Sequence, residues 1–318
     1  MPQQFTFTVF TPTYNRIRTL PRLFESLKSQ EFRDFEWLIV DDGSSDGTPD
    51  LVQQWLPQAS FPMRYIWQEN SGKHIAHNRA VEDALGTFFI TVDSDDYLLP
   101  ISLRRFKEHW DTIPEESREE FTGVTALCVD EQGKLIGSRF PADVIDSDLV
   151  RIQYRFDVRG DKIGFHRTQH LQDLPFPEIA EPVVPEGVVW DRLSLRFRTR
   201  FVNEVLQVKE YLAGGFTRSS RSRPESFAVG HALWNRYVIN DYIRWFGFTP
   251  MRFIRAAANY SRFAFHAGDS IYTQGSRLTR QSSRALWLLL LPLGYLIFLR
   301  DGRRAKARRS RSSVGTTG

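Results

Sequence analysis

Short apolar segments alternate with amphipathic segments over residues 5–98, and this alternation constrains the fold more than any other feature of the chain. The apolar segments are rich in β-branched and aromatic residues, as buried strands are. They lie at residues 5–10 (FTFTVF), 35–40 (FEWLIV), 63–68 (MRYIWQ) and 87–92 (TFFITV). Apolar residues at helical spacing occupy the intervals, over residues 17–27, 51–56 and 75–85. Because strands that alternate with helices pair in parallel, we expect an α/β fold with a mostly parallel sheet flanked by helices.

The remaining chain loses this alternation. We expect, in order, strands with turns over residues 121–140, a loop-rich region over 141–185, a helix over 185–197 and a closing strand over 199–211. Past Gly214 the sequence changes to helical segments that carry many Arg and aromatic residues. The sequence therefore predicts two parts, an α/β domain over residues 1–216 and a helical C-terminal region over residues 217–318.

The C-terminal region contains an apolar segment over residues 285–299 (ALWLLLLPLGYLIFL), with basic residues on both sides. Fifteen helical residues reach about 22 Å, less than the ~30 Å hydrocarbon core of a bilayer, and Pro292 interrupts them. The tail over residues 300–311 holds seven Lys or Arg and one Asp, so it carries the excess positive charge of a chain whose net charge is +4. We expect residues 281–311 to lie on an anionic membrane surface without spanning it. The alternative is a buried helix followed by a disordered tail.

Composition indicates the compartment. The single cysteine, Cys128, excludes an internal disulfide and suits a reducing environment. The N-terminal sequence MPQQFTFTVF has no positive region followed by a long apolar stretch, so no secretory signal is visible. We expect a cytoplasmic protein, peripheral on the inner face of the cell membrane. Aromatic residues make up 14% of the chain, which fits sugar-stacking or membrane-interface surfaces, with a large aromatic core as the alternative.

An acidic turn, TVDSDDYLLP over residues 91–100, follows the fourth predicted strand. Crowding Asp93, Asp95 and Asp96 at a strand end costs free energy unless something positive binds there. Asp93 and Asp95 lie two residues apart and can both turn toward a hard divalent cation, which takes oxygen ligands. Such a cation completes its shell with water and substrate phosphates, which points to a nucleotide diphosphate. A solvated acidic turn is the alternative.

Other metal and phosphate motifs do not fit. A calcium loop after the second strand would have Gln53 where the motif needs Glu. The Gly-Lys pair of NSGKHIA lacks the first Gly of a P-loop, since Trp67 occupies that position. His74 and His77 have the spacing of zinc ligands on a helix, but no third ligand joins them at a recognisable spacing. These exclusions leave the acidic turn as the candidate centre.

Two stretches carry a resemblance, VFTPTYNRIRTLPRLFESLKSQEFRDFEWLIVDDGSSDGT and QENSGKHIAHNRAVEDALGTFFITVDSDDYLLP. Together they resemble the nucleotide-sugar-binding half of the inverting family-2 glycosyltransferases, which have the GT-A fold. The similarity runs over residues 9–100 and continues more loosely to Tyr211. It implies a GT-A-type sheet and a metal-dependent enzyme that uses Mn²⁺ or Mg²⁺.

The resemblance also implies roles for single residues. Asp95 is the implied metal ligand with Asp93 as its partner, and Asp96 caps the turn or contacts the donor sugar. The loop after the first strand wraps the nucleotide, Asp42 contacts the base and Asp41 is its neighbour. The implied nucleotide-sugar contacts are Thr11, Pro12, Thr13, Tyr14, Asn15, Arg16, Asp41, Asp42, Asn70, Lys73, His77, Asn78, Asp93, Ser94, Asp96 and Trp190. The family's Ala-Arg-Asn reads Ala76-His77-Asn78 here, which leaves open whether His77, Lys73 or Arg79 makes the missing contact of that Arg.

Inversion at the anomeric carbon needs a general base, because the acceptor hydroxyl loses its proton as it attacks. In the family this base is commonly the Asp of a Glu-Asp pair four residues before a helical Trp. This chain lacks that pair, but Glu186 stands four residues before Trp190. We therefore predict Glu186 as the base, with Asp191 as the second candidate. A Glu that merely complements the dipole of a helix starting after Pro185 is the alternative.

The residues and the resemblance together predict an inverting transferase that moves a sugar from a nucleotide diphosphate donor to a glycan or lipid-linked acceptor at the cytoplasmic membrane face. The resemblance favours UDP as the nucleotide. A nucleotidyltransferase of the same fold would need a Gly-rich, Arg- or Lys-bearing loop after the first strand, which is absent from the sequence. A catalytically silent nucleotide-sugar-binding module would lack the base. A nucleic-acid partner is not expected, because the basic tail has no interleaved aromatic residues.

Overall fold

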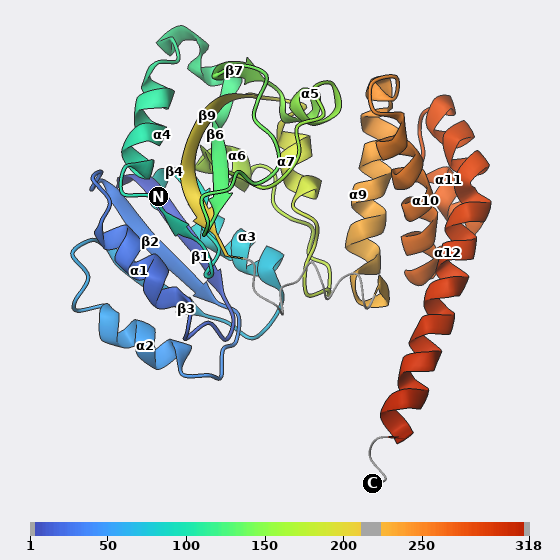
Figure 1. Cartoon of the computed structure of the whole chain (residues 1–318), viewed down its shortest axis with the longest axis horizontal. Coiled ribbons are helices and arrows are strands. Elements are labelled where there is room, and N and C mark those ends of the chain that lie inside the picture. Colours follow the sequence, from blue (N-terminus) through green and yellow to red (C-terminus); the bar gives the residue numbers. More distant parts are fainter. Residues whose placement is uncertain (1–3, 211–223, 315–318) are drawn as a thin grey trace. The chain divides into compact units, whose positions relative to one another are not determined.

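The structure is a computed structural model that describes residues 4–210 and 224–314, with side chains described up to Arg304. The chain divides into two compact units. The first unit comprises Met1–Ala180 and Val189–Ala213, and the second comprises Glu181–Val188 and Gly214–Gly318. Figure 1 shows the strands in the first unit and a set of helices in the second.

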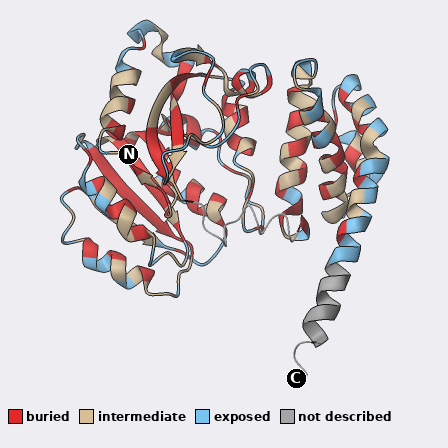
Figure 2. Cartoon of the chain, in the orientation of Figure 1, coloured by how far each residue is buried: buried red, intermediate tan, exposed pale blue. Residues whose placement is uncertain are grey.

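The parallel half of the sheet confirms the predicted alternation. Four parallel strands take the order β3-β2-β1-β4. Their bounds are β1 (Phe5–Thr13), β2 (Phe35–Asp41), β3 (Met63–Trp67) and β4 (Gly86–Thr91), and the helices between them are α1 (Leu20–Lys28), α2 (Thr48–Trp55) and α3 (Lys73–Asp83). β2 is buried along its whole length, as the red strands in Figure 2 show, because helices cover both faces of a sheet of this kind.

The second half of the sheet departs from the prediction. Residues 141–185 were expected to be loop-rich, yet they contain β8 (Lys162–Arg167), which pairs antiparallel with β4 and with β6 (Phe121–Asp130). The loop-rich prediction was wrong here because β8 is short and because its pairing depends on a close approach between the backbones of β8 and β6. A Cβ on Gly123 would lie 1.7 Å from the carbonyl oxygen of Phe165. Glycine therefore allows the central strands to meet.

The sheet has nine strands within the described residues, in the order β3-β2-β1-β4-β8-β6-β9-β5, with β7 paired to β9. The closing strand was predicted correctly as β9 (Arg198–Lys209), and the other two are β5 (Tyr97–Leu98) and β7 (Val144–Ser147). The remaining helices of this half are α4 (Ser102–Asp111), η1 (Glu115–Glu120), α5 (Leu149–Tyr154), α6 (Thr168–Gln172) and α7 (Gly187–Leu193). The sheet is thus mixed, with its predicted parallel strands at one end.

The core of the first unit is strongly aromatic. Phe24 stacks on Trp55 with ring centroids 4.5 Å apart, and Phe88 lies 4.6 Å from Phe165. Trp37 is fully buried, and its indole N–H donates to the hydroxyl of Thr11 at 2.9 Å. Burial of large rings stabilises a domain strongly, since each contributes a large apolar area. Much of the aromatic content therefore belongs to the core and not to exposed surfaces.

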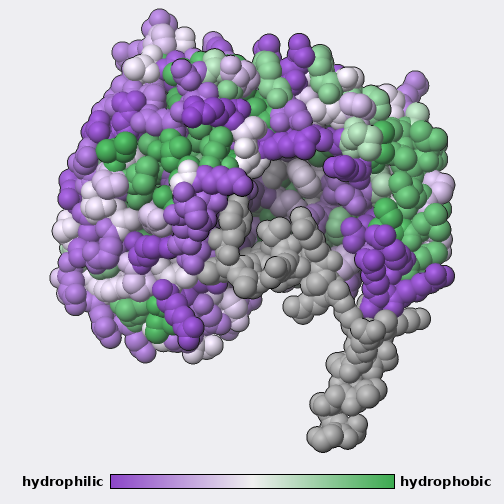
Figure 3. All heavy atoms as spheres, viewed as in Figure 1, coloured by the Kyte–Doolittle hydropathy of each residue, from purple (hydrophilic) through white to green (hydrophobic). Residues whose placement is uncertain are grey.

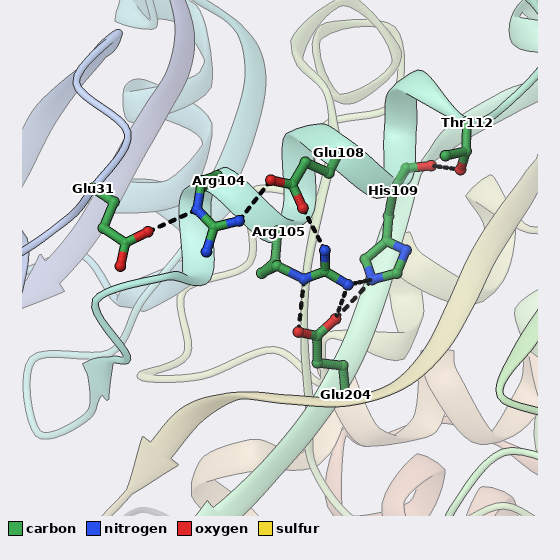
Figure 4. A network of polar contacts seen from close by, with 7 residues as sticks. All are labelled: Glu31, Arg104, Arg105, Glu108, His109, Thr112 and Glu204. Carbon is green, nitrogen blue, oxygen red and sulfur yellow. Dashed lines mark hydrogen bonds and ion pairs between the residues drawn. The ribbon is translucent and has the colours of Figure 1, made fainter.

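A polar network fastens α4 to β9 on the outside of this core (Figure 4). Glu204 on β9 accepts hydrogen bonds from the guanidinium of Arg105 at 2.8 and 3.0 Å. The same carboxylate lies 2.8 Å from Nε2 of His109. Glu108 is bound by Arg104 at 2.6 Å and also by Arg105, and Arg104 reaches Glu31 at 2.7 Å. The network is structural, because it links a helix and a strand through matched charges.

The second unit is helical. Its elements are η2 (Pro224–Phe227), α9 (Ala228–Asp241), η3 (Ile243–Trp245), α10 (Pro250–His266), α11 (Ile271–Ser276) and α12 (Gln281–Val314). α10 packs against both α9 and α12. A Cβ on Gly294 would lie 2.6 Å from the carbonyl oxygen of Ala258, so glycine lets α12 approach α10 closely. The buried carboxylate of Asp301 on α12 accepts a hydrogen bond from Arg262 on α10 at 2.6 Å, which is a second contact between these helices.

α12 extends beyond the apolar segment at both ends. The helix continues through Pro292, so the expected interruption at this proline was wrong, and the arrangement of the segment at a membrane stays a prediction. The stretch Gln281–Arg304 is long and apolar enough to cross a membrane, and only 17% of its most apolar window is buried. Trp287, Gly294 and Asp301 form its buried side. Its other side leaves leucines exposed, which does not fit the alternative of a fully buried helix.

Candidate active site

The acidic turn lies at the carboxyl end of β4. In the order β3-β2-β1-β4, the chain adds strands on one side of β1 and then places β4 on its other side, so the turn lies beside a change in strand order. The backbone N–H of Asp96 donates to the carbonyl of Asp93 at 3.0 Å and closes the turn. Carboxylate oxygens of Asp93, Asp95 and Asp96 lie within 4.8 Å of one another. Ser94 between them is buried. The predicted residues are thus brought together, at the edge where open α/β sheets place ligands.

Two lysines of the protein compensate this negative charge. Nζ of Lys73, the first residue of α3, lies 2.7 Å from the carboxylate of Asp93. Nζ of Lys209, the last residue of β9, lies 2.8 Å from Asp96 and 3.9 Å from Asp93. The sequence predicted the carboxylates and Lys73 but missed Lys209, because only the β6–β9–β5 pairing carries this residue to the turn.

Burial and neighbouring charges give the three carboxyl groups different pKa values. Burial alone raises the pKa of Asp93, but the ammonium groups of Lys73 and Lys209 outweigh it and hold the pKa at about 2. Burial and the neighbouring charge of Asp93 raise the pKa of Asp95. Burial raises the pKa of Asp96 to about 7, although Lys209 opposes this change. The group therefore combines a firmly ionised carboxylate with two that gain from an added cation.

The turn fits a hard divalent cation such as Mn²⁺ or Mg²⁺. Carboxylate oxygens are the ligands that these ions prefer, and the other metal ligands come from water and phosphate. Asp95 is the least engaged of the three, since among the described residues its carboxylate pairs with Arg16 alone, at 4.0 Å. Within the described part of the chain no other group of three Asp, Glu, His or Cys residues has its ligand atoms this close. Asp95 and Asp93 are therefore the residues that would hold the ion.

Arg22 on α1 supports the turn from outside, and the sequence did not single it out. Its guanidinium donates to the backbone carbonyl of Asp95 at 2.8 Å and to Glu210 at 2.6 Å. It also donates to Glu131 at 2.7 Å and lies over the ring of Tyr97, 4.6 Å from the centroid. One side chain thus ties the turn to the ends of β6 and β9. No local motif signals this, because the partners are distant in sequence.

The two predicted nucleotide loops are bound to each other. Asn15 has a φ of +53°, and its backbone N–H donates to the hydroxyl of Ser44 at 2.8 Å. In return, the backbone N–H of Ser45 donates to the side-chain oxygen of Asn15 at 2.8 Å. The backbone N–H of Arg16 donates to Thr48 at 3.1 Å. Asparagine tolerates this left-handed conformation better than most residues, so it suits a tight loop here.

Asp42 fixes a third loop. Its carboxylate accepts from the side chain of Gln68 at 2.8 Å and from the backbone N–H groups of Ser71 and Gly72 at 2.8 and 2.9 Å. Its carbonyl accepts from Asn70 at 2.8 Å. The buried carboxylate is therefore already well bonded by the protein, and it holds in place the loop that leads into α3. A contact between Asp42 and a base stays a prediction.

The predicted nucleotide contacts in the first-strand loop, and Asp41 beside it, differ in exposure: several are buried, but Tyr14 is exposed. Asp41 is fully buried and accepts from the hydroxyl of Tyr65 at 2.7 Å, and burial together with this bond raises the pKa of Tyr65. Thr11 and Thr13 are also buried, and Pro12 is partly buried. Tyr14 is 46% exposed, so its ring is available to a ligand.

His77 and Trp190 meet although they are distant in sequence. Their ring centroids lie 5.5 Å apart, and Phe176 lies 5.0 Å from His77. Asn78 binds the backbone of Phe176 reciprocally, at 2.9 Å for each bond. His74 does not join a zinc site, since its Nε2 lies 2.9 Å from the carbonyl oxygen of Ile179. His77 is buried among these aromatic rings. Of the residues considered for the missing Arg contact, Lys73 is the one that lies beside the acidic turn.

The two candidate bases differ in exposure. Glu186 is exposed and directly precedes α7, within the segment that belongs to the second unit. Asp191 lies inside α7, belongs to the first unit and is only 1% exposed. An exposed carboxylate can reach an acceptor hydroxyl, whereas a buried one cannot without rearrangement. The assignment of either residue stays a prediction.

Comparisons with known proteins agree with this geometry. The family described as Glycosyl transferase family 2 matches residues 8–116. A glucosyltransferase of Campylobacter jejuni, GalNAc(5)-diNAcBac-PP-undecaprenol beta-1,3-glucosyltransferase, is 28% identical over 143 residues, 44% of each chain. An uncharacterized glycosyltransferase of Rickettsia felis is 30% identical over 238 residues, 74% of this chain and 37% of that protein. The chain thus spans less than half the length of these curated relatives.

Solved structures share the fold. Staphylococcus aureus TarS, residues 1–349 in complex with UDP-GlcNAc, has a TM-score of 0.58 and 17% identity, with 90% of each chain covered. A mannosyltransferase from Pyrobaculum calidifontis in complex with GDP-Man and Mn²⁺ has a TM-score of 0.51 and 18% identity, with 94% of this chain and 88% of that chain covered. These likenesses extend over both halves of the sheet, including the part where the sequence signal is weak.

Proposed function

The chain carries a family-2 glycosyltransferase domain with the GT-A fold, and we propose that it is a metal-dependent inverting glycosyltransferase. The donor in this proposal is a nucleotide diphosphate sugar, with UDP favoured because TarS was solved with UDP-GlcNAc and with UDP. The acceptor is a glycan or a lipid-linked glycan, as the name of the Campylobacter jejuni relative suggests. The observation that carries the proposal is the compensated acidic turn beside three interlocked loops.

The charges around the turn suit a leaving diphosphate. In this proposal Asp95 and Asp93 hold Mn²⁺ or Mg²⁺, which would neutralise charge on the departing diphosphate. Lys73, in the first turn of α3, and Arg16, near Asp95, can bind phosphate oxygens directly. Tyr14 and Asn15 would contact the nucleotide from the neighbouring loop. Glu186 would take the proton of the acceptor hydroxyl, with Asp191 as the second candidate.

The test is a screen of nucleotide sugars for binding and hydrolysis, with Mn²⁺, with Mg²⁺ and with EDTA. We expect one donor to bind only with the metal and to be turned over. Asp95→Asn should lower turnover by about a hundredfold or more, because an ion of this kind contributes several kcal/mol. Asp143→Asn, which changes an exposed carboxylate elsewhere in the first unit, is the matched control. Equal activity in EDTA would refute the metal dependence.

A second pair of variants tests the base. Glu186→Gln should abolish transfer and leave donor binding nearly unchanged, because the base acts only on the acceptor. Asp191→Asn should leave transfer intact, because in this proposal Glu186 and not Asp191 is the base. Retained transfer by Glu186→Gln would end that assignment. A protein that binds a donor but never turns it over would instead be a silent binding module.

We further propose that residues 281–311 hold the protein on the cytoplasmic face of the membrane. Support comes from the exposed leucines of α12, including Leu289, which is 75% exposed, and from the exposed Arg300, Arg303 and Arg304. α12 packs along α10 through Gly294 and Asp301, which suits a helix lying in the interface better than one crossing the bilayer. Membrane flotation of the purified chain tests this, and a chain that stays with the soluble fraction contradicts it.

A further inference from the structure

A groove in the second unit lies between η3 and the start of α12. Its volume is about 580 Å³. It is lined by Ile243, Arg244, Phe246, Arg280, Ser282, Ala285, Leu286 and Leu289. The lining thus combines an aliphatic and aromatic wall with two guanidinium groups and a hydroxyl. All of these residues belong to the second unit, whereas the acidic turn belongs to the first.

The two arginines of the groove are available to an external anion. Neither Arg244 nor Arg280 has a carboxylate partner among the residues that the structure describes, and both are exposed. Arg244 lies over the ring of Trp245, 5.4 Å from its centroid, which restrains its guanidinium without neutralising it. Other arginines of the same unit are paired, such as Arg262 with Asp301 and Arg277 with Asp269. The groove therefore carries two positive charges that no carboxylate of the described residues compensates.

The apolar wall of the groove continues along α12. Leu289 lines the groove and is 75% exposed, and Leu293 and Leu296, four and seven residues later, are 45% and 62% exposed. This spacing places the three side chains on one face of the helix. Figure 3 shows apolar residues gathered on the outer face of α12, with hydrophilic residues below them. Phe248, in the loop after η3, is also exposed, at 48%.

We propose that this groove binds the phosphate group of an anionic membrane lipid, with Arg244 and Arg280 on the phosphate oxygens. Guanidinium groups bind phosphate through paired hydrogen bonds, and the hydroxyl of Ser282 offers one more donor. Phe246, Leu286 and Leu289 contact the start of an acyl chain, which leads toward the apolar face of α12. A free acidic protein or nucleic acid would match the charges but not this wall. The proposal rests on the membrane association proposed above.

Vesicle sedimentation tests the groove. The full chain is mixed with phosphatidylcholine vesicles, with vesicles that also contain phosphatidic acid, and with vesicles of equal surface charge made with a fatty acid. We expect the strongest binding to phosphatidic acid. Arg244→Gln and Arg280→Gln should each weaken that binding about fivefold, since a basic residue at an anionic surface contributes a factor of this size. Arg255→Gln, an exposed arginine of α10 outside the groove lining, is the matched control.

The outcomes separate this proposal from the ones before it. Unchanged binding to phosphatidic acid vesicles by the doubly substituted chain overturns the groove, even where membrane association holds. An equal loss on fatty-acid vesicles also overturns it, because surface charge alone then explains the effect. Unchanged unfolding and unchanged nucleotide-sugar binding by the variants show that the loss is local. Donor turnover without any vesicle binding would leave the enzyme proposal standing and overturn the groove.

Discussion

The acidic turn of the first unit and the outer face of α12 in the second unit differ in how their charges are paired and in how much apolar surface they expose. In the turn, Asp93 and Asp96 are paired with lysines, and the neighbouring Val92 and Leu98 are buried. On α12, leucines are exposed and nearby arginines lack carboxylate partners among the described residues. The first arrangement suits a small charged ligand in one fixed position, because its charges are held at short distances. The second suits an extended, deformable surface such as a lipid bilayer.

The strongest way to break the compensated turn is Lys209→Met. This change leaves the buried carboxylate of Asp96 without its partner at 2.8 Å, and we expect the free energy of unfolding to fall by about 3 kcal/mol. The loss should shrink below about pH 7, because burial already raises the pKa of Asp96 to about 7 and a protonated carboxyl needs no partner. Urea denaturation at several pH values measures it.

The matched control for this prediction is the double variant Lys209→Met with Asp96→Asn. Removing both charges leaves no unpaired ion, so most of the lost stability should return. A double variant as unstable as Lys209→Met would mean that Lys209 acts through packing and not through its charge. The comparison with α12 would then lose its electrostatic basis.

The packed side of α12 gives the second prediction, Gly294→Ala. A Cβ at this position would lie 2.6 Å from the carbonyl oxygen of Ala258 and 2.6 Å from Cβ of Ser261, so α10 and α12 must separate. We expect a loss of about 2 kcal/mol despite the better helix propensity of alanine. Gly302→Ala is the control in the same helix, since a Cβ there meets nothing within 4 Å. It should be neutral or slightly stabilising, and equal thermal unfolding of both variants would contradict the packing argument.

The exposed side of α12 gives the third prediction, Leu296→Gln. This leucine is 62% exposed, so the thermal unfolding of the protein should hardly change. Vesicle binding should weaken by about tenfold, because a leucine buried in lipid contributes roughly 1.5 kcal/mol or more. Leu195→Gln is the control, since Leu195 is 48% exposed but lies in the first unit. Equal vesicle binding by both variants would remove the distinction between the two sides of α12.

Sequence reasoning predicted the parallel strands and the acidic turn because both depend on local signals. Alternating apolar segments fixed β1 to β4, and an aspartate cluster after a strand marked the turn. It missed β8 because the pairing of this short strand depends on glycine contacts such as Gly123 with Phe165. It missed Lys209 and Arg22 because their partners lie up to 188 positions away, as Arg22 and Glu210 do. Positions brought together by topology leave no local pattern.

The smallest effect is expected from Glu204→Gln in the α4–β9 network of Figure 4. Burial alone raises the pKa of Glu204, but hydrogen bonds from Arg105 and His109 outweigh it and lower the pKa below its ordinary value. A carboxyl whose pKa is lower in the folded state stabilises the fold above its unfolded pKa, and this contribution is lost as the pH falls through the folded pKa. We therefore expect the variant to lose about 1 kcal/mol or less at neutral pH, with the difference from the natural chain disappearing in acid. Urea denaturation at pH values on both sides of about 4 measures this, and a difference that stayed constant in acid would show that the network stabilises the protein through shape and not charge.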